Sequence, residues 1–288
     1  MSVTERIIKT SHGDIAVSES GGNGMPVLFI HGNSSSKEVF GEILAGPIGK
    51  NFRAIAIDLP GHGASSDAVD PVRTYSMPGY ADAAVETLAL MGIDRAAVVG
   101  WSLGGHVAME MMPRFPGMVG VMISGAPPVG QGVEKVMMGF RPSPHVGLVG
   151  QPQLSPDEIE IFLYASYGPA AADPRWRAAL MRTDGRARAL MFQSLATGST
   201  SDQRAIVENS PVPVAVVNGA DDPLVETSYV GNVAYRSLWD NHCYVLRGAG
   251  HASFLHVADA FDAILSRFLA DMAKRNAKTG PSGKVAAA

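Results

Sequence analysis

The 288-residue sequence has one cysteine, few charged residues and no long apolar run without proline or glycine. The lone Cys243 excludes an internal disulfide and any zinc site built on several cysteines. Charged residues make up 17% of the chain, below the usual share of about a quarter, which excludes intrinsic disorder and favours a well-filled core. The longest uncharged stretch, residues 115–133, contains three prolines and several glycines, so we expect no membrane span.

Basic residues are also too few to form a nucleic-acid surface. The 23 Lys and Arg are outnumbered by 27 Asp and Glu, for a formal net charge of −4, and no basic stripe is available to neutralise phosphates. We therefore expect no nucleic-acid partner and a small, weakly charged ligand instead. The first ten residues have neither a signal-peptide apolar region nor a transit-peptide composition, so a cytoplasmic location is the default expectation.

Short β-rich runs alternate with helical patterns along the chain. Several runs are apolar without alternation, as expected of parallel strands covered on both faces. The runs are residues 25–30, 52–57, 96–99, 120–124, 212–217 and 242–246. Residues 79–91 and 103–112 read as helices, and apolar residues from 254 to 269 recur at helical spacing. The order predicts an α/β fold with a mostly parallel, doubly wound sheet.

The alternation stops between residues 128 and 211, an interval far longer than an ordinary connecting loop. Helix-compatible stretches at 157–166, 174–182 and 186–195 lie in this interval, which predicts an inserted helical cap, or lid, over the carboxyl ends of the strands. We accordingly expect a core of residues 1–128 and 211–273 and a cap of residues 129–210. Residues 274–288 are polar and then small, and are expected to form a flexible C-terminal tail.

The strongest chemical signal is the sequence Gly-Trp-Ser-Leu-Gly-Gly at residues 100–105. It follows a predicted strand and precedes a predicted helix, which is the context of a nucleophile elbow. Small residues flank Ser102 because other backbone must pass close to such a sharp turn. The sequence therefore predicts Ser102 as a catalytic nucleophile.

A serine hydroxyl needs a base, because it is a weak nucleophile at neutral pH. His251 follows the last predicted strand, where the hydrolase order of serine, acid and histidine places the base. The other histidines are read as structural or surface residues: His12, His31, His62, His106, His145, His242 and His256.

The acid that orients the base should follow the strand at 212–217, where Asp221 and Asp222 stand. The usual spacing after the strand-ending glycine selects Asp222, and Asp221 is left to cap the next turn. A variant position after the preceding strand holds no carboxylate.

Backbone N–H groups must stabilise the oxyanion of an acyl transfer. His31-Gly32-Asn33 follows the strand at 25–30, which predicts an oxyanion hole formed by the N–H groups of Asn33 and Leu103. The Asn33 side chain has two readings, a substrate contact or a local turn. No HExxH or HxHxDH motif, P-loop or dinucleotide fingerprint is present, so neither a metal nor a cofactor is expected.

These motifs together resemble the α/β-hydrolase superfamily. The resemblance rests on HGN at 31–33, DLPGHG at 58–63, GWSLGG at 100–105, NGADD at 218–222 and AGH at 249–251. Longer strings resemble the AidH-type N-acyl-homoserine lactonases within that superfamily. They are HGNSSS at 31–36, YSMPGYADA at 75–83, GWSLGGH at 100–106, APPV at 126–129 and TDGRAR at 183–188, the last inside the predicted cap.

The resemblance spans most of residues 5–272 and is thinnest from 130 to 175. It implies a metal-independent serine hydrolase that opens the lactone ring of quorum-sensing signals, with Ser102, Asp222 and His251 as its catalytic triad. Asn33 would lie at the oxyanion site. One departure is Asp222, since the lactonase has glutamate at that position.

The resemblance also implies substrate contacts, for which we expect Asn33, Trp101 and an aromatic residue of the cap. Tyr164 is preferred over its neighbours Phe162 and Tyr167. Further apolar cap residues either line an acyl-chain pocket or pack the cap's own core: Met137, Met138, Phe140, Trp176, Met191 and Phe192.

Several alternatives remain open at this stage. A general carboxylesterase, another lactonase or an acylase would use the same triad, and a hydrolase-fold receptor could bind a small ligand without turnover. A dehalogenase is disfavoured because Ser102 stands where that chemistry uses aspartate. The expected partner is a small lactone or ester, and we expect a monomer.

Overall fold

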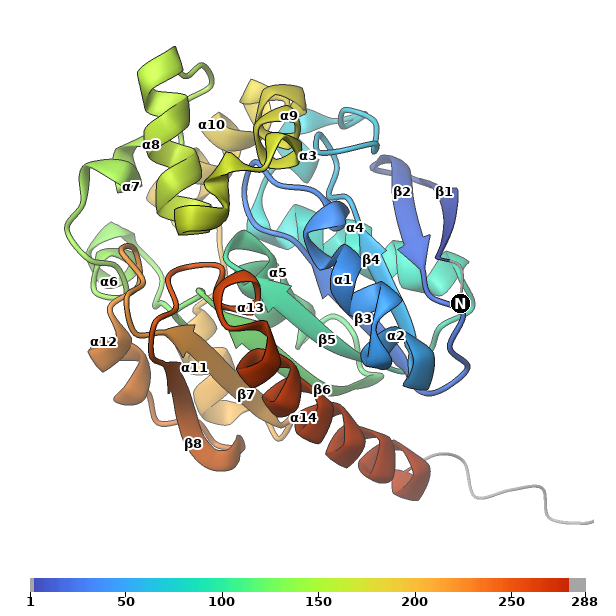
Figure 1. Ribbon diagram of the computed structural model, residues 1–288. Coiled ribbons are helices and arrows are strands. Elements are labelled where there is room, and N and C mark those ends of the chain that lie inside the picture. Colours follow the sequence, from blue (N-terminus) through green and yellow to red (C-terminus); the bar gives the residue numbers. More distant parts are fainter. Residues whose placement is uncertain (1–2, 280–288) are drawn as a thin grey trace, which may run out of the picture.

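A computed structural model describes residues 3–279, apart from the side chains of residues 144, 145 and 279. Within this range the strands form one eight-stranded sheet in the order β1-β2-β4-β3-β5-β6-β7-β8 (Figure 1). The strands are β1 (Thr4–Thr10), β2 (Gly13–Glu19), β3 (Pro26–Ile30), β4 (Arg53–Ile57), β5 (Ala96–Trp101), β6 (Met118–Ser124), β7 (Val214–Gly219) and β8 (Leu238–Leu246). From β4 to β8 all neighbours are parallel, and the predicted doubly wound α/β class is confirmed.

The hairpin of β1 and β2 was not predicted. It pairs antiparallel with β4 at the edge of the sheet. Most of β1 is exposed, so this strand has no apolar run that would mark it in the sequence.

Two apolar layers cover the sheet because alternate residues of each strand point to opposite faces. Leu28 and Ile30 of β3 belong to one buried cluster, and Val27 and Phe29 belong to the other. The helices of the core are α1 (Gly41–Ala45), α2 (Pro47–Asn51), α3 (Pro71–Thr74), α4 (Met77–Leu90), α5 (Leu103–Met111), α12 (Thr227–Gly231), α13 (Ser253–His256) and α14 (Ala258–Thr279), with a 3-10 turn at Lys37–Phe40. Helices α4 and α5 pack on the first face, and α1, α2 and α14 on the second.

The predicted helical interval between β6 and β7 is helical in the structure. It contains α6 (Val133–Met137), α7 (Pro144–Leu148), α8 (Pro156–Tyr167), α9 (Pro174–Arg182), α10 (Gly185–Ala196) and α11 (Gln203–Asn209), with a 3-10 turn at Gly168–Ala172. We refer to residues 129–210 as the insertion. Helices α8, α9 and α10 lie together at one end of the sheet (Figure 1), where Asn33 Nδ2, just beyond β3, donates to the carbonyl oxygen of Val149 at 2.9 Å.

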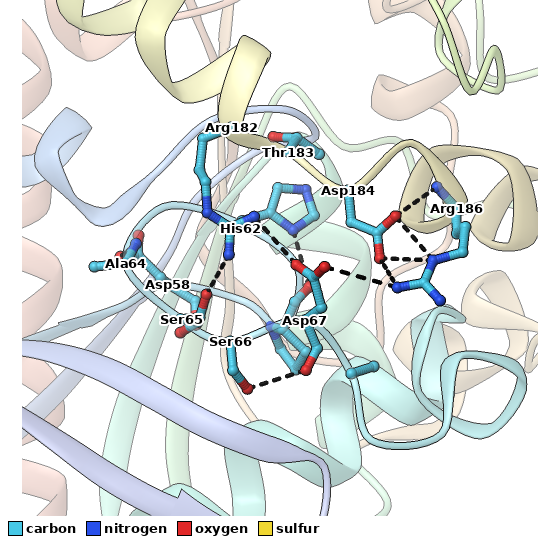
Figure 2. A network of polar contacts seen from close by, with 12 residues as sticks. Asp58, His62, Ala64, Ser65, Ser66, Asp67, Arg182, Thr183, Asp184 and Arg186 are labelled. Carbon is cyan, nitrogen blue, oxygen red and sulfur yellow. Dashed lines mark hydrogen bonds and ion pairs between the residues drawn. The ribbon is translucent and has the colours of Figure 1, made fainter.

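The insertion is tied to the core through the loop that follows β4 (Figure 2). Arg182 donates to the carbonyl oxygen of Ser65 at 2.8 Å and pairs with Asp67, which also lies 3.7 Å from Arg186. The side chains of Arg182 and Asp67 are 42% and 49% exposed, so this ion pair adds little stability. Asp184 is the more buried tie, since it accepts from the Tyr75 hydroxyl at 2.7 Å.

The predicted start of the C-terminal tail is wrong. Helix α14 continues past Lys274 as far as Thr279, because its apolar stripe, including Phe268, Leu269 and Met272, is anchored on the sheet and the helix propagates beyond it. The remainder of the predicted tail, residues 280–288, lies outside the described residues. Within the described residues, no helix combines the length and apolar character needed to cross a bilayer.

Candidate active site

The turn between β5 and α5 holds Ser102 in a conformation that non-glycine residues rarely adopt. Its φ is 54° and its ψ is −122°, so the surrounding fold must compensate for backbone strain. A Cβ at Gly100 would lie 2.2 Å from the carbonyl oxygen of Gly104, and one at Gly104 would lie 2.0 Å from that of Ile30. The glycines of the motif are therefore required by backbone that passes close to the serine, as the sequence predicted.

The loop that follows β3 packs directly against this turn. A Cβ at Gly32 would come within 3.1 Å of the Ser102 Cβ and 3.0 Å of the Trp101 ring. Within residues 3–279, the N–H groups of Asn33 and Leu103 have no protein acceptor. Both are therefore available to a ligand bound beside Ser102, which is what an oxyanion hole requires.

His251 and Asp222 form a buried pair beside the serine. The Asp222 Oδ2 lies 2.9 Å from His251 Nδ1, and the two side chains are 0% and 3% exposed. Oδ1 of Asp222 accepts from the N–H groups of Leu224 and Val225 at 2.8 and 3.1 Å. The carboxylate is thereby fixed from both ends, and a proton on His251 Nδ1 leaves Nε2 free to act as a base.

Asp222 is held ionised by its surroundings. Burial alone would raise the pKa of Asp222, but the attraction of His251, its hydrogen bond and the two backbone donors together lower that pKa below its usual value. Trp101 supports the histidine from the other side, because its Nε1 donates to the carbonyl oxygen of His251 at 3.0 Å. Asp221, the alternative acid, is exposed and its N–H donates to the carbonyl of Ala249.

Ser102, His251 and Asn33 border a cavity with two lobes. The larger lobe is almost entirely apolar away from these residues and lies against the insertion; its walls include Met77, His106, Val136, Met137, Phe140, Met191, Phe192 and Leu195. The smaller lobe is walled by Trp101, Phe162, Ala165 and Ser166. Four of the six insertion residues considered as pocket candidates thus line the larger lobe: Met137, Phe140, Met191 and Phe192.

The prediction for Tyr164 is wrong. Its side chain is 68% exposed and borders neither lobe, because α8 turns residues 162, 165 and 166 inward and residue 164 lies on the opposite face. Tyr167 is buried instead and donates from its hydroxyl to Ser35 Oγ at 2.9 Å. Of the other candidates, Trp176 stacks on Tyr167 at 5.1 Å between ring centroids, and Met138 is 56% exposed.

The side chain of Asn33 makes a long-range contact that the sequence did not predict. Its backbone N–H points to no protein acceptor among the described residues, whereas its side chain donates to Val149 of the insertion and accepts from Ser34 Oγ at 3.2 Å. The side chain thus joins the loop after β3 to the wall of the cavity. It also borders both lobes, so a ligand there would touch it.

The DLPGHG segment is structural. Asp58 accepts from the N–H groups of Lys37 and Ala64 at 2.6 and 2.8 Å and so clamps two loops together. His31 Nε2 accepts from the N–H of Leu59 at 3.0 Å, and burial lowers the pKa of His31 to about 4, so the ring is neutral. Among the described residues no cluster of His, Cys, Asp and Glu has the makings of a metal site.

Sequence reasoning missed His106 as a residue of the cavity wall. It lies one turn of α5 beyond Ser102, and its N–H donates to the carbonyl oxygen of Ser102 at 3.2 Å. The spacing of four residues from the serine on a predicted helix was the available signal, because residues four apart share a helix face. Val149 and Leu224 also border the cavity, at positions without a sequence motif.

The match to a family model agrees with this geometry. Residues 27–265 match the model of the alpha/beta hydrolase family, so the chain belongs to that family. Among solved structures, the N-acyl homoserine lactonase AidH complexed with N-butanoyl homoserine is 45% identical, with a TM-score of 0.91, over 98% of this chain and 99% of that one. An AidH variant complexed with N-hexanoyl homoserine lactone is 46% identical, with a TM-score of 0.90, over 93% and 98%. The resemblance predicted from the sequence is confirmed.

Curated relatives are more distant. A 2-hydroxy-6-oxononadienedioate/2-hydroxy-6-oxononatrienedioate hydrolase of Pseudomonas sp. is 27% identical over 90% of this chain and 93% of its own length. An uncharacterised protein of Mycobacterium tuberculosis is 35% identical over 115 residues, which are 40% of this chain and 33% of that protein. The chain thus spans about a third of the length of this last relative.

Proposed function

We propose that the protein is an N-acyl-homoserine lactonase, a serine hydrolase that opens the lactone ring of quorum-sensing signals. The observation that carries the proposal is the strained Ser102, set beside the buried His251–Asp222 pair at the mouth of an apolar lobe. AidH, which is 45% identical over nearly the whole chain, has been solved with N-butanoyl homoserine. The substrate class is thus a small amphiphilic lactone with an apolar chain.

In the proposed reaction, Ser102 Oγ attacks the lactone carbonyl carbon while His251 Nε2 takes the hydroxyl proton. Asp222 holds the imidazole in place, and the N–H groups of Asn33 and Leu103 donate to the oxyanion. Collapse of this intermediate breaks the ring C–O bond, and His251 returns the proton to the departing alkoxide oxygen, which stays tethered. Water then attacks the Ser102 ester with His251 as base and releases N-acyl-homoserine.

We propose that the insertion serves as the cap of this site. The lactone ring would occupy the smaller lobe beside Trp101, and the acyl chain the larger lobe, whose flexible methionines adapt to chains of different length. Enclosure by the cap would also limit water around the oxyanion. In this arrangement the core performs the chemistry and the insertion selects the acyl chain.

The test is mass spectrometry of an N-acyl-homoserine lactone incubated with the purified protein in the presence of a chelator. We expect the substrate to gain the mass of one water and to keep its acyl chain attached to homoserine. Because every proposed catalytic group belongs to this chain, the chelator should not lower the rate. Ser102→Ala should lower turnover by several orders of magnitude in a folded protein.

Three results would contradict parts of the proposal. Free fatty acid with homoserine lactone would indicate an acylase, and near-normal turnover by folded Ser102→Ala would remove the serine from the mechanism. Unchanged substrate would direct the search to simple esters. An uncatalysed control at the same pH is required, because lactones open slowly in water without enzyme.

We further propose a monomeric cytoplasmic enzyme that binds neither nucleic acid nor membrane. The formal net charge of −4 with mixed signs supports the absence of a nucleic-acid surface. Size-exclusion chromatography with light scattering should give a mass near the 30.2 kDa of one chain. A mass of twice that value would overturn the monomer.

A further inference from the structure

His106 is a buried polar group that the proposed reaction does not use. It lies in the wall of the larger lobe with only 5% of its surface exposed, among apolar neighbours such as Phe140, whose ring centroid is 6.0 Å away. Burial lowers the pKa of His106 to about 4, so the ring is neutral. A neutral imidazole has one donor and one acceptor nitrogen, and its surroundings decide which is which.

A chain of hydrogen bonds behind the wall of the larger lobe determines which ring nitrogen of His106 carries the proton. Glu110 is fully buried, pairs with Arg114 at 3.0 Å and accepts from Ser201 Oγ at 2.6 Å. Gln203 directs its Nε2 toward Glu110 Oε1 at 3.4 Å and its Oε1 toward His106 Nδ1 at 2.7 Å.

The reverse orientation of the Gln203 amide would set its oxygen against the Glu110 carboxylate, which can only accept. Gln203 therefore donates to Glu110 and accepts from His106. The proton of His106 sits on Nδ1, and Nε2 presents a lone pair. Within residues 3–279, Nε2 has no hydrogen-bond partner, and it is not one of the fully buried polar atoms that lack one. It therefore has accessible surface, which faces the cavity that His106 lines.

The position of this acceptor fits a particular atom of the proposed substrate. Four residues of helix separate His106 from Ser102, a rise of about 6 Å. The third carbon of the acyl chain is five bonds from the attacked lactone carbonyl, about 6 Å in an extended chain. A chain running from Ser102 into the larger lobe would bring that carbon alongside His106.

We propose that His106 is a specificity-determining residue whose Nε2 accepts a hydrogen bond from a hydroxyl on the third carbon of the acyl chain. The inference rests on the proposed lactonase function and adds the substrate class to it. A 3-hydroxyl donates to the fixed lone pair, whereas a 3-oxo oxygen would meet it as a second acceptor. The protein should therefore prefer 3-hydroxyacyl over 3-oxoacyl homoserine lactones.

The experiment compares kcat/KM for the N-octanoyl, N-(3-hydroxyoctanoyl) and N-(3-oxooctanoyl) homoserine lactones, followed by mass spectrometry of the ring-opened products. The wild-type protein should favour the 3-hydroxy over the 3-oxo substrate by about fivefold, as expected of one neutral hydrogen bond. The two 3-hydroxy enantiomers should also differ, because the acceptor is at a fixed point.

Two variants test the cause. His106→Phe keeps a planar ring but removes the lone pair, so the ratio of 3-hydroxy to 3-oxo should fall to about one. Gln203→Leu frees His106 to carry its proton on Nε2 and donate to the 3-oxo group, so the ratio should fall here too, although His106 is unchanged. Phe140→Leu, a control in the same wall, should change all three rates in proportion and keep the ratio.

The outcomes separate this inference from the proposed function. If the wild-type protein opens all three lactones with no preference for the 3-hydroxy chain, the inference is wrong and the lactonase stands. An unchanged ratio in folded His106→Phe has the same meaning. If none of the three lactones is opened, the proposed function fails and the inference fails with it.

Discussion

The two sides of the cavity are built on different principles. On the core side, Ser102, His251 and the N–H groups of Asn33 and Leu103 are held by backbone, by glycines and by short hydrogen bonds. On the insertion side, the wall of the larger lobe consists of methionine, phenylalanine, valine and leucine residues from α6, α7, α10 and the segments next to α6 and α7. For the proposed reaction, the contrast teaches that the reacting groups would be positioned by rigid main chain, whereas the ligand would be selected by exchangeable apolar surface.

The largest expected effect lies on the core side, where Asp222→Asn should lower kcat by about 10⁴-fold. An amide in place of the carboxylate no longer orients and stabilises the imidazolium, although the geometry is kept. The neighbouring Asp221→Asn is the matched control and should leave kcat almost unchanged. Steady-state kinetics on both variants measures the difference. A loss of kcat of this size in Asp221→Asn would indicate that Asp221 is the acid.

Gly104→Ala should destabilise the fold by about 3 kcal/mol and abolish most activity, because the new Cβ would lie 2.0 Å from the carbonyl oxygen of Ile30. Gly41→Ala serves as control, since a Cβ there meets nothing within 4 Å. Urea denaturation gives both free energies of unfolding. Equal stability of the two variants would show that the elbow has room to relax and that the core side is less rigid than described.

On the insertion side, Arg188→Met should cost about 2 kcal/mol of stability and raise KM more than it lowers kcat. The buried guanidinium donates to Ser34 Oγ at 3.1 Å and to the carbonyls of Gln151 and Pro152 at 2.7 and 2.9 Å, and losing it leaves these acceptors unpaired. Arg182→Met removes the exposed pairing with Asp67 shown in Figure 2 and one hydrogen bond to the Ser65 carbonyl oxygen, and should cost less than about 1 kcal/mol. A fall in kcat with unchanged KM for Arg188→Met would indicate that this residue affects the chemical step and not ligand binding.

The smallest effect concerns His62, in the loop after β4 that the insertion contacts through Asp184 and Gly61, and whose pKa burial lowers to about 3. A histidine in an unfolded chain has a pKa near 6.5. Below that pH the unfolded chain binds a proton at this residue and the folded chain does not, so the free energy of unfolding decreases as the pH falls. Between pH 7.5 and 5.5 this histidine should remove about 1 kcal/mol. His62→Phe should weaken the pH dependence of the free energy of unfolding in urea by that amount. An unchanged pH dependence would mean that folding does not lower the pKa of His62.

Local patterns were enough to predict most of the sheet and the core side of the site. Largely apolar runs indicated β3 to β7, because parallel strands are covered on both faces. The glycines around Ser102 indicated a sharp turn that only small residues permit. The exposed β1 had no such mark, and neither did the point at which α14 ends. Tyr164 was misplaced because the resemblance is thinnest there and does not fix the helical phase, in which a step of one residue turns a side chain by about 100°.

The sequence by itself determined the α/β class, the choice of Ser102, His251 and Asp222 as the candidate triad, and the existence of a helical insertion, because each follows from residues close together in the chain. Only the tertiary structure decided which insertion side chains face the cavity, that Asn33 holds Val149, and that Gln203 sets the proton of His106. These contacts join residues separated by 97 and 116 positions. Such contacts form only when separately specified elements pack, and no local periodicity encodes how they meet.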